Sequence, residues 1–202
     1  MDSANIDTLV QAVADRLFIP IEASGRHVHV TGPQAKTLFG HELTPDRPLS
    51  QPGQYLAKER VTVIGPKGTF ENVAVLGPER KAAQIEISLT DGRTLGITPP
   101  IRPSGQVDGT PGITLIGPCG QVTLNQGVLA AQRHIHLSPE DGHRFGVTDK
   151  QIVKLQSYTN RPVLFEDVMV RISPDFRAAA HLDYDEANAC GFQKGDLGRI
   201  IP

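Results

Sequence analysis

The stretch RHVHVTGP at residues 26–33 returns later in the chain as RHIHLSP at residues 133–139. Each copy leads into a Phe-Gly pair, at residues 39–40 and 145–146. Two further pairs of segments match downstream. VAVLGPER at residues 73–80 matches VMVRISPD at residues 168–175, and EISLTD at residues 86–91 matches HLDYDE at residues 181–186. Self-similarity of this kind predicts an internal repeat. We therefore expect two related β domains, divided near residues 103–120.

The composition around these stretches is typical of a mainly β protein. The 20 glycines and 16 prolines fall between short apolar runs, as turns fall between strands. Strands are predicted at residues 25–30, 60–65, 70–76, 84–89, 94–97, 113–116, 121–124, 133–137, 152–156, 163–172 and 197–201. Short helices are predicted after each His-x-His strand, at residues 33–39 and 139–145. The dipeptide Asp91-Gly92 is interpreted as a turn.

The first 18 residues differ from the rest, because apolar residues recur there at helical spacing and Pro20 ends the pattern. The apolar positions are Ile6, Leu9, Val10, Val13, Leu17 and Phe18. The spacing predicts an amphipathic helix over residues 1–18. Such a helix either packs on its own domain or docks on a partner protein, and the pattern leaves both interpretations open.

Charge and cysteine content exclude several classes of protein. The formal net charge of −2 gives no electrostatic reason to expect nucleic-acid or membrane binding. No apolar run approaches the ~20 residues of a membrane span, and no signal peptide is recognisable at the N-terminus. Cys119 and Cys190 are too few for a disulfide framework and are expected to be structural. These features favour a cytoplasmic protein.

The His-x-His strands carry the chemistry that the repeat implies. Successive strand residues point to opposite faces, so that His27 and His29 project from one face about 7 Å apart. A strand can thus present two imidazoles to one metal ion, with Val28 packed behind. Ligand type favours zinc, with other first-row divalent metals as alternatives. The two remaining histidines, His41 and His143, are expected on the surface.

A catalytic zinc ion commonly takes three protein ligands and leaves one position open. The matched segments offer a third ligand in each half, a glutamate in the first and a histidine in the second. The candidate sets are His27, His29 and Glu86, and His134, His136 and His181. Arg80 precedes the glutamate and could hold a phosphate or a carboxylate beside the metal. The alternative is a surface arginine in the run Glu79-Arg80-Lys81.

Several segments together resemble the PduL-type phosphate propanoyltransferases, namely residues 19–31, 75–80, 84–91, 133–138 and 181–189. The similarity extends over about residues 19–202. The chain departs from the family pattern at Gly25, where the pattern has Asn, and at residues 81–83, which replace a more polar stretch. The second departure adjoins the expected phosphate site and bears on substrate preference.

The resemblance implies a phosphotransacylase, an acyltransferase that interconverts short-chain acyl-CoA and phosphate with acyl phosphate and CoA, propanoyl-CoA being the expected substrate. It implies two β-barrel domains with short capping helices, over residues 19–110 and 111–202, and a dinuclear zinc site between them. By position, each candidate set holds one of two Zn²⁺ ions per chain, and Arg80 handles phosphate. Acyl-chain preference and the CoA-contacting residues are not indicated.

Family members of bacterial microcompartments often carry an N-terminal amphipathic targeting helix, which residues 1–18 resemble. The resemblance therefore implies the microcompartment lumen as the location and shell or cargo proteins as partners. Self-association into a homo-oligomer is left open.

Two other functions fit the residues alone. One is a dinuclear zinc hydrolase, in which water replaces phosphate as the nucleophile. The other is a non-catalytic β-barrel binding module with structural zinc ions.

Overall fold

The computed structural model describes residues 8, 10, 13 and 16–202, which fall into two compact units. The barrel unit contains the described residues up to 24 together with residues 133–182 and 186–202. The open-sheet unit contains residues 25–132 and 183–185. Each unit has its own hydrophobic core.

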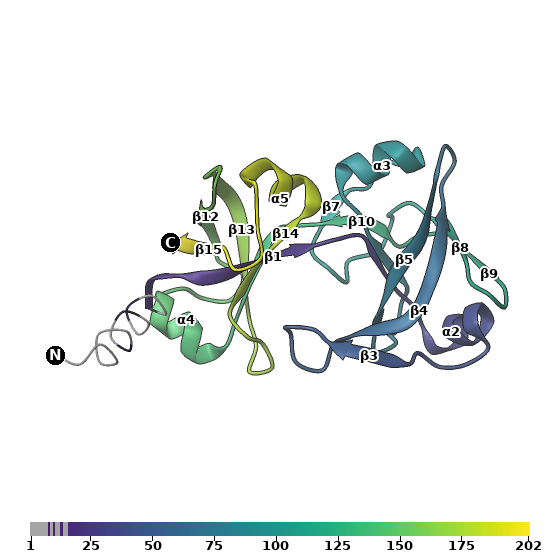
Figure 1. Ribbon diagram of the computed structural model, residues 1–202, viewed down its shortest axis with the longest axis horizontal. Helices are drawn as coiled ribbons and strands as arrows, with labels where there is room; N and C mark the ends of the chain where they lie inside the picture. The colour runs from purple at the N-terminus through teal and green to yellow at the C-terminus, as the bar shows by residue number, and fades with distance from the viewer. Residues whose placement is uncertain (1–7, 9, 11–12, 14–15) are drawn as a thin grey trace. The chain divides into compact units, whose positions relative to one another are not determined.

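The open-sheet unit is built on nine strands in the order β7-β10-β6-β2-β5-β4-β8-β9, with β3 paired to β4. The strands are β2 (His27–His29), β3 (Pro45–Pro48), β4 (Tyr55–Ile64), β5 (Thr69–Gly77), β6 (Gln84–Glu86), β7 (Ile101–Arg102), β8 (Ile113–Ile116), β9 (Gln121–Leu124) and β10 (Val128–Ala131). Its helices are α2 (Gly32–Phe39) and α3 (Leu89–Leu95). Figure 1 shows α3 near the turn that joins β4 to β5, where the Lys67 amide donates to the Leu95 carbonyl at 3.0 Å.

The barrel unit is a closed barrel of six strands in the order β1-β14-β11-β13-β12-β15. The strands are β1 (Ile19–Ser24), β11 (His134–Leu137), β12 (Ile152–Tyr158), β13 (Leu164–Ile172), β14 (Ala179–Asp183) and β15 (Leu197–Ile201), and the helices are α4 (Pro139–Phe145) and α5 (Tyr184–Cys190). The predicted mainly β architecture is confirmed. One of the two expected barrels is closed, whereas the other unit curls as an open sheet that starts at β7 and ends at β9.

The chain passes between the units at other places than residue 110, where the sequence suggested the division. Strand β1 pairs with β15, with Ile19 opposite Gly198, so the start of the described chain belongs with its end. Strands β8, β9 and β10 follow residue 110 but join the sheet of the first half, because β8 pairs with β4 and β10 pairs with β6. The chain therefore crosses between the units after Ser24 and after Gln132, and again on either side of the short segment 183–185.

The two units share one local arrangement of strands. In the open-sheet unit β2 lies between β5, which is parallel to it, and β6, which is antiparallel. In the barrel unit β11 lies between β13, again parallel, and β14, again antiparallel. Both long parallel neighbours contain a residue in the left-handed region, Asn72 at φ 55° in β5 and Asp167 at φ 53° in β13. The His-x-His strands are thus central strands in equivalent surroundings.

Three helices begin at capping boxes and end at left-handed glycines, which satisfies backbone groups at both ends. The boxes are Thr31 with Gln34, Ser88 with Asp91 and Ser138 with Asp141, and the glycines are Gly40, Gly96 and Gly146. The predicted strand at residues 94–97 and the predicted turn at Asp91-Gly92 are therefore wrong. The Ser88-x-x-Asp91 spacing and Gly96 identify α3 instead. The predicted helices at 33–39 and 139–145 are confirmed by α2 and α4.

The other predicted strands are confirmed, though with shifted ends in several cases. Strands β1, β3, β7, β10 and β14 and helix α5 were not predicted. The helix predicted over residues 1–18 lies largely outside the described residues. Residues 8, 10, 13, 16 and 17, which are described, are helical and exposed. Within the described part of the chain, no helix is long and apolar enough to cross a bilayer.

Candidate metal centres

Three ligand-type side chains meet at the centre of the open-sheet unit. The antiparallel register sets His27 opposite Glu86 and His29 opposite Gln84, so all four side chains lie on one face of the β2–β6 pair. His27, His29 and Glu86 are buried, and one ligand atom from each lies within 4.8 Å of the others. The His27 Nε2 atom is 3.6 Å from Glu86 Oε1. The fold thus brings together the first predicted set.

The hydrogen bonds of both histidines select one ring nitrogen for a ligand. His27 donates its Nδ1–H to the Gly25 carbonyl at 2.8 Å, and His29 donates its Nδ1–H to the Leu76 carbonyl at 3.1 Å. In the neutral form of each ring these bonds place the hydrogen on Nδ1 and leave Nε2 as the atom that can bind a metal ion. Metal-binding histidines almost always donate their other ring N–H in this way. The donor set therefore fits a metal ion such as Zn²⁺.

Burial and charge shift the pKa values of all three groups. Burial lowers the pKa of His27, but the Glu86 carboxylate outweighs it and the net shift is upward. Burial, followed by the charges of His27 and Arg80, lowers the pKa of His29 to about 2. Burial raises the pKa of Glu86, but the charge and hydrogen bond of His27 lower it far below its usual range. The cluster therefore favours an ionised carboxylate beside a neutral His29.

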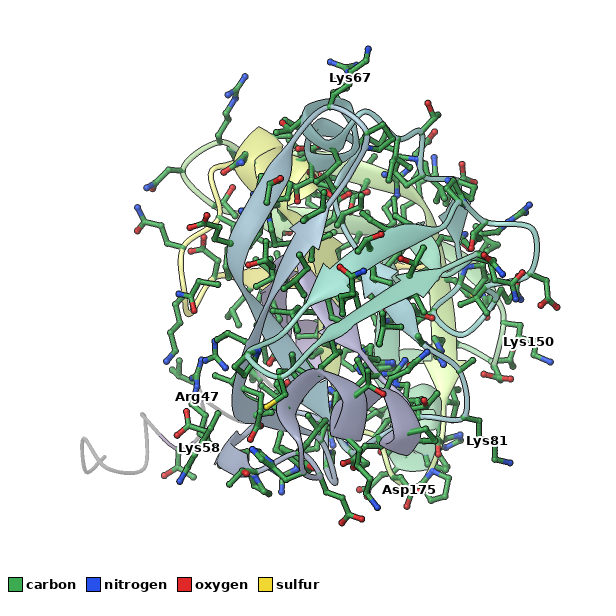
Figure 2. The ribbon with its side chains drawn as sticks, turned by 90° about the vertical axis from the view of Figure 1, so that its right-hand side faces the viewer. Arg47, Lys58, Lys67, Lys81, Lys150 and Asp175 are labelled. Carbon is green, nitrogen blue, oxygen red and sulfur yellow. The ribbon has the colours of Figure 1, made fainter. Side chains whose placement is uncertain are left out.

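Arg80 lies beside this cluster and is half-buried. Its Nη1 atom donates to Ser104 Oγ at 3.5 Å, and the Ser104 hydroxyl donates to Glu86 Oε1 at 2.9 Å. The guanidinium charge lowers the pKa values of both His27 and His29. Lys81 is exposed and points outward, as Figure 2 shows. Of these two neighbouring cations, Arg80 thus faces the cluster whereas Lys81 faces solvent.

A second cluster lies in the barrel unit, where β11 and β14 pair with His134 opposite His181. His134, His136 and His181 each place a ring nitrogen within 4.8 Å of the others. The Nδ1 atom of His136 is 3.2 Å from Nε2 of His181. Two nitrogens bound to one tetrahedral zinc would be separated by about 3.3 Å, given zinc–nitrogen bonds of about 2.0–2.1 Å. The second predicted set is therefore also brought together, at a spacing that suits a metal.

Sequence reasoning missed some polar residues beside the two clusters. Glu22 of β1 places Oε2 3.8 Å from His181 Nε2, and β1 was not among the predicted strands. Gln84 and Ser104 contact Glu86. The sequence carried a signal for Gln84 alone, because it lies two residues before Glu86 in a strand and so shares its face.

The arginine before each His-x-His strand forms an ion pair with the helix that follows the third ligand. Arg26 contacts Asp91 of α3 at 2.6 Å, and Arg133 contacts Glu186 of α5 at 2.6 Å. One pair thus joins the start of β2 to α3, and the other joins the start of β11 to α5. Cys190 is buried and donates to the Ala187 carbonyl, in keeping with a structural role.

The fold and the clusters define a class: a mainly β protein of two units, each with three side chains that could hold a metal ion. Comparison with known proteins is more specific. Residues 20–193 match the family model of phosphate propanoyltransferase. The chain is 52% identical over 209 residues to the phosphate propanoyltransferase of Enterococcus faecalis, with 100% of this chain and 98% of the relative covered.

Further relatives carry the same name. The phosphate propanoyltransferase of Listeria monocytogenes is 49% identical over 207 residues, covering 100% of this chain and 97% of the relative. That of Thermotoga maritima is 50% identical over 186 residues, covering 91% and 89%. The chain belongs to the phosphate propanoyltransferase family, and it is an acyltransferase.

Proposed function

We propose that this protein transfers the propanoyl group between CoA and phosphate, with one Zn²⁺ ion at each of the two clusters. The observation that carries the proposal is the position of Arg80 beside the His27, His29 and Glu86 cluster in a member of this family. A cation next to a metal site of this kind suits an anionic nucleophile such as phosphate.

The reaction forms one bond and breaks one bond. A phosphate oxygen forms a bond to the thioester carbonyl carbon, the carbon–sulfur bond breaks, and propanoyl phosphate and CoA result. When bound, zinc supplies Lewis-acid chemistry, which polarises a carbonyl and stabilises a thiolate. The guanidinium of Arg80 holds the phosphate through paired N–H donors and offsets its charge as the bond forms. Its link to Ser104 limits the positions that the guanidinium can take.

The two ligand sets differ in charge. His27, His29 and Glu86 would hold one zinc ion with a formal ligand charge of −1, whereas three neutral histidines would hold the other. The first ion is therefore the less positive of the two. This difference favours unequal tasks, with the more positive ion better suited to stabilise negative charge on oxygen or sulfur.

Arg80→Ala tests the proposal, and Lys81→Ala is the matched control because Lys81 is its exposed neighbour. CoA release is measured with acetyl-, propanoyl- and butanoyl-CoA, with and without phosphate, alongside zinc content. We expect Arg80→Ala to lose phosphate-dependent transfer by about 10²–10³-fold, as for removal of one charge-stabilising group, with two zinc ions retained. Full turnover in Arg80→Ala would contradict the assigned role. CoA release that does not need phosphate would indicate a hydrolase.

We also propose that the two units are copies of one repeat. The matched strand pairings, the left-handed residues Asn72 and Asp167, and the two ion pairs that follow the His-x-His strands support this interpretation. A repeat explains why ligands of the same type occupy equivalent strands in both units.

For the N-terminal segment, we propose a role in docking to shell or cargo proteins in the lumen of a bacterial microcompartment. Val10, Val13 and Leu17 are helical, follow one another at helical spacing, and are 61%, 49% and 43% exposed. An exposed apolar stripe of this spacing suits a groove on a partner.

A further inference from the structure

Gln84 is the most deeply buried polar side chain beside the open-sheet cluster, with 1% of its surface exposed. It sits opposite His29 in the β2–β6 register, two residues before Glu86. Its Nε2 atom donates to Glu86 Oε1 and to Ser104 Oγ, the second at 2.9 Å. Its Oε1 atom accepts from the Gly105 amide at 2.6 Å. Both amide hydrogens and the amide oxygen are thus used.

The surroundings permit one orientation of this amide. The Gly105 backbone N–H can only donate, so the oxygen of Gln84 must face it. The NH₂ group then has to face Glu86 and Ser104. The Ser104 hydroxyl accepts from Gln84 and from Arg80 and donates its own hydrogen to Glu86. Each N–H and O–H donor of Gln84 and Ser104 has an acceptor, and the result is a continuous chain of hydrogen bonds from Arg80 to Glu86.

The barrel unit has no counterpart of this amide at the equivalent register position. There His136 lies opposite Ala179, where His29 lies opposite Gln84 in the other unit. The third ligand candidate of the barrel unit is also an imidazole, His181, rather than a carboxylate. A glutamate side chain has one more rotatable bond than a histidine and needs outside hydrogen bonds to hold one orientation. Gln84 is present in the unit that has the glutamate.

We infer that Gln84 is a positioning residue of the open-sheet metal site. Together with Ser104, it holds the Glu86 carboxylate in its metal-binding orientation and sets the distance from that carboxylate to the Arg80 guanidinium. The inference rests on the proposed zinc and phosphate chemistry. It adds that the affinity of one of the two zinc ions depends on an amide that does not itself bind metal.

Gln84→Met and Ser104→Ala test this, with Gln106→Ala as the control because Gln106 is exposed on the same turn. Met keeps the length of the side chain and removes both N–H donors. Zinc affinity is measured by competition with a chromogenic chelator on the full chain, and the zinc ion of the barrel unit serves as an internal reference. We expect Gln84→Met to weaken one zinc equivalent by about 10–100-fold and to leave the other unchanged. Ser104→Ala should weaken the same equivalent less and raise the KM for phosphate more than it lowers kcat.

The possible outcomes separate the role of Gln84 from the proposed zinc chemistry. Wild-type affinity for both zinc equivalents in a folded Gln84→Met variant would overturn the inference. If Gln84→Met does not fold, Ser104→Ala decides, since its site lies on a half-buried turn, and unchanged zinc affinity and phosphate KM there would also overturn it. Fewer than two zinc equivalents in the wild-type protein would instead contradict the proposed function. A loss of both equivalents in Gln84→Met would indicate a general structural role.

Discussion

The ion pair between Arg26 and Asp91 permits a quantitative prediction about the strand that carries His27 and His29. The Nε and Nη2 atoms of Arg26 donate to the two carboxylate oxygens of Asp91, at 3.1 and 2.6 Å. The Asp91 side chain is 7% exposed and that of Arg26 is 37% exposed. Asp91 also accepts from the Ser88 amide at 3.3 Å, as part of the α3 capping box. The pair therefore fastens β2 to the start of α3.

Arg26→Met removes the guanidinium and keeps much of its packing against Phe70, whose ring centroid lies 4.0 Å from the Arg26 Cζ atom. Breaking a fully buried ion pair costs about 3–5 kcal/mol, because a buried charge is left unpaired. Water reaches the arginine side of this pair and screens the charge left on Asp91, so we expect a loss of about 2 kcal/mol. Asp91→Asn keeps a capping side chain and removes the charge that needs a partner.

The assay is denaturant unfolding of the metal-free protein, carried out as a double-mutant cycle with Arg26→Met, Asp91→Asn and the double variant. Arg133→Met is the matched substitution in the barrel unit, where Glu186 is the partner at 2.6 Å. We expect a coupling energy of about 1–2 kcal/mol between Arg26 and Asp91. A coupling energy below about 0.5 kcal/mol, the value of an ordinary surface pair, would refute the reasoning.

Two further predictions concern pH and the N-terminal segment. Because the pKa of His29 is lowered from 6.5 to about 2, the unfolded chain binds a proton there that the folded, metal-free chain does not. The free energy of unfolding should thus fall as pH drops below 6.5, by at most about 1.4 kcal/mol per pH unit from this group, and urea unfolding of His29→Gln should show a flatter pH dependence. An equal slope in both proteins would exclude His29 as the source. Deletion of residues 1–18 should leave specific activity unchanged but abolish co-purification with microcompartment shells, whereas an unfolded or inactive product would favour a helix that packs on its own unit.

The part of the fold that follows from local pattern was predictable from the sequence. Alternation in the His-x-His stretches predicts strands, and β2 and β11 confirm this. Helix α3 was missed because Asp91-Gly92 was interpreted as a turn, although Ser88 and Asp91 have the spacing of a capping box. Residues 89–95 form a helix rather than a turn because the Ser88–Asp91 capping box stabilises its start and Gly96 its end.

The matched segments of the sequence indicated which residues of the two units are candidates for metal ligands, because alternation within a strand and likeness between segments can be recognised without the fold. That these residues bind zinc stays a prediction. Only the tertiary structure decided that β1 completes the barrel, that one sheet stays open, and that Gln84 and Ser104 link Arg80 to Glu86. The reason is that strand order and side-chain networks depend on pairing between segments far apart in the chain, whereas sequence periodicity records only which face each residue occupies within its own strand.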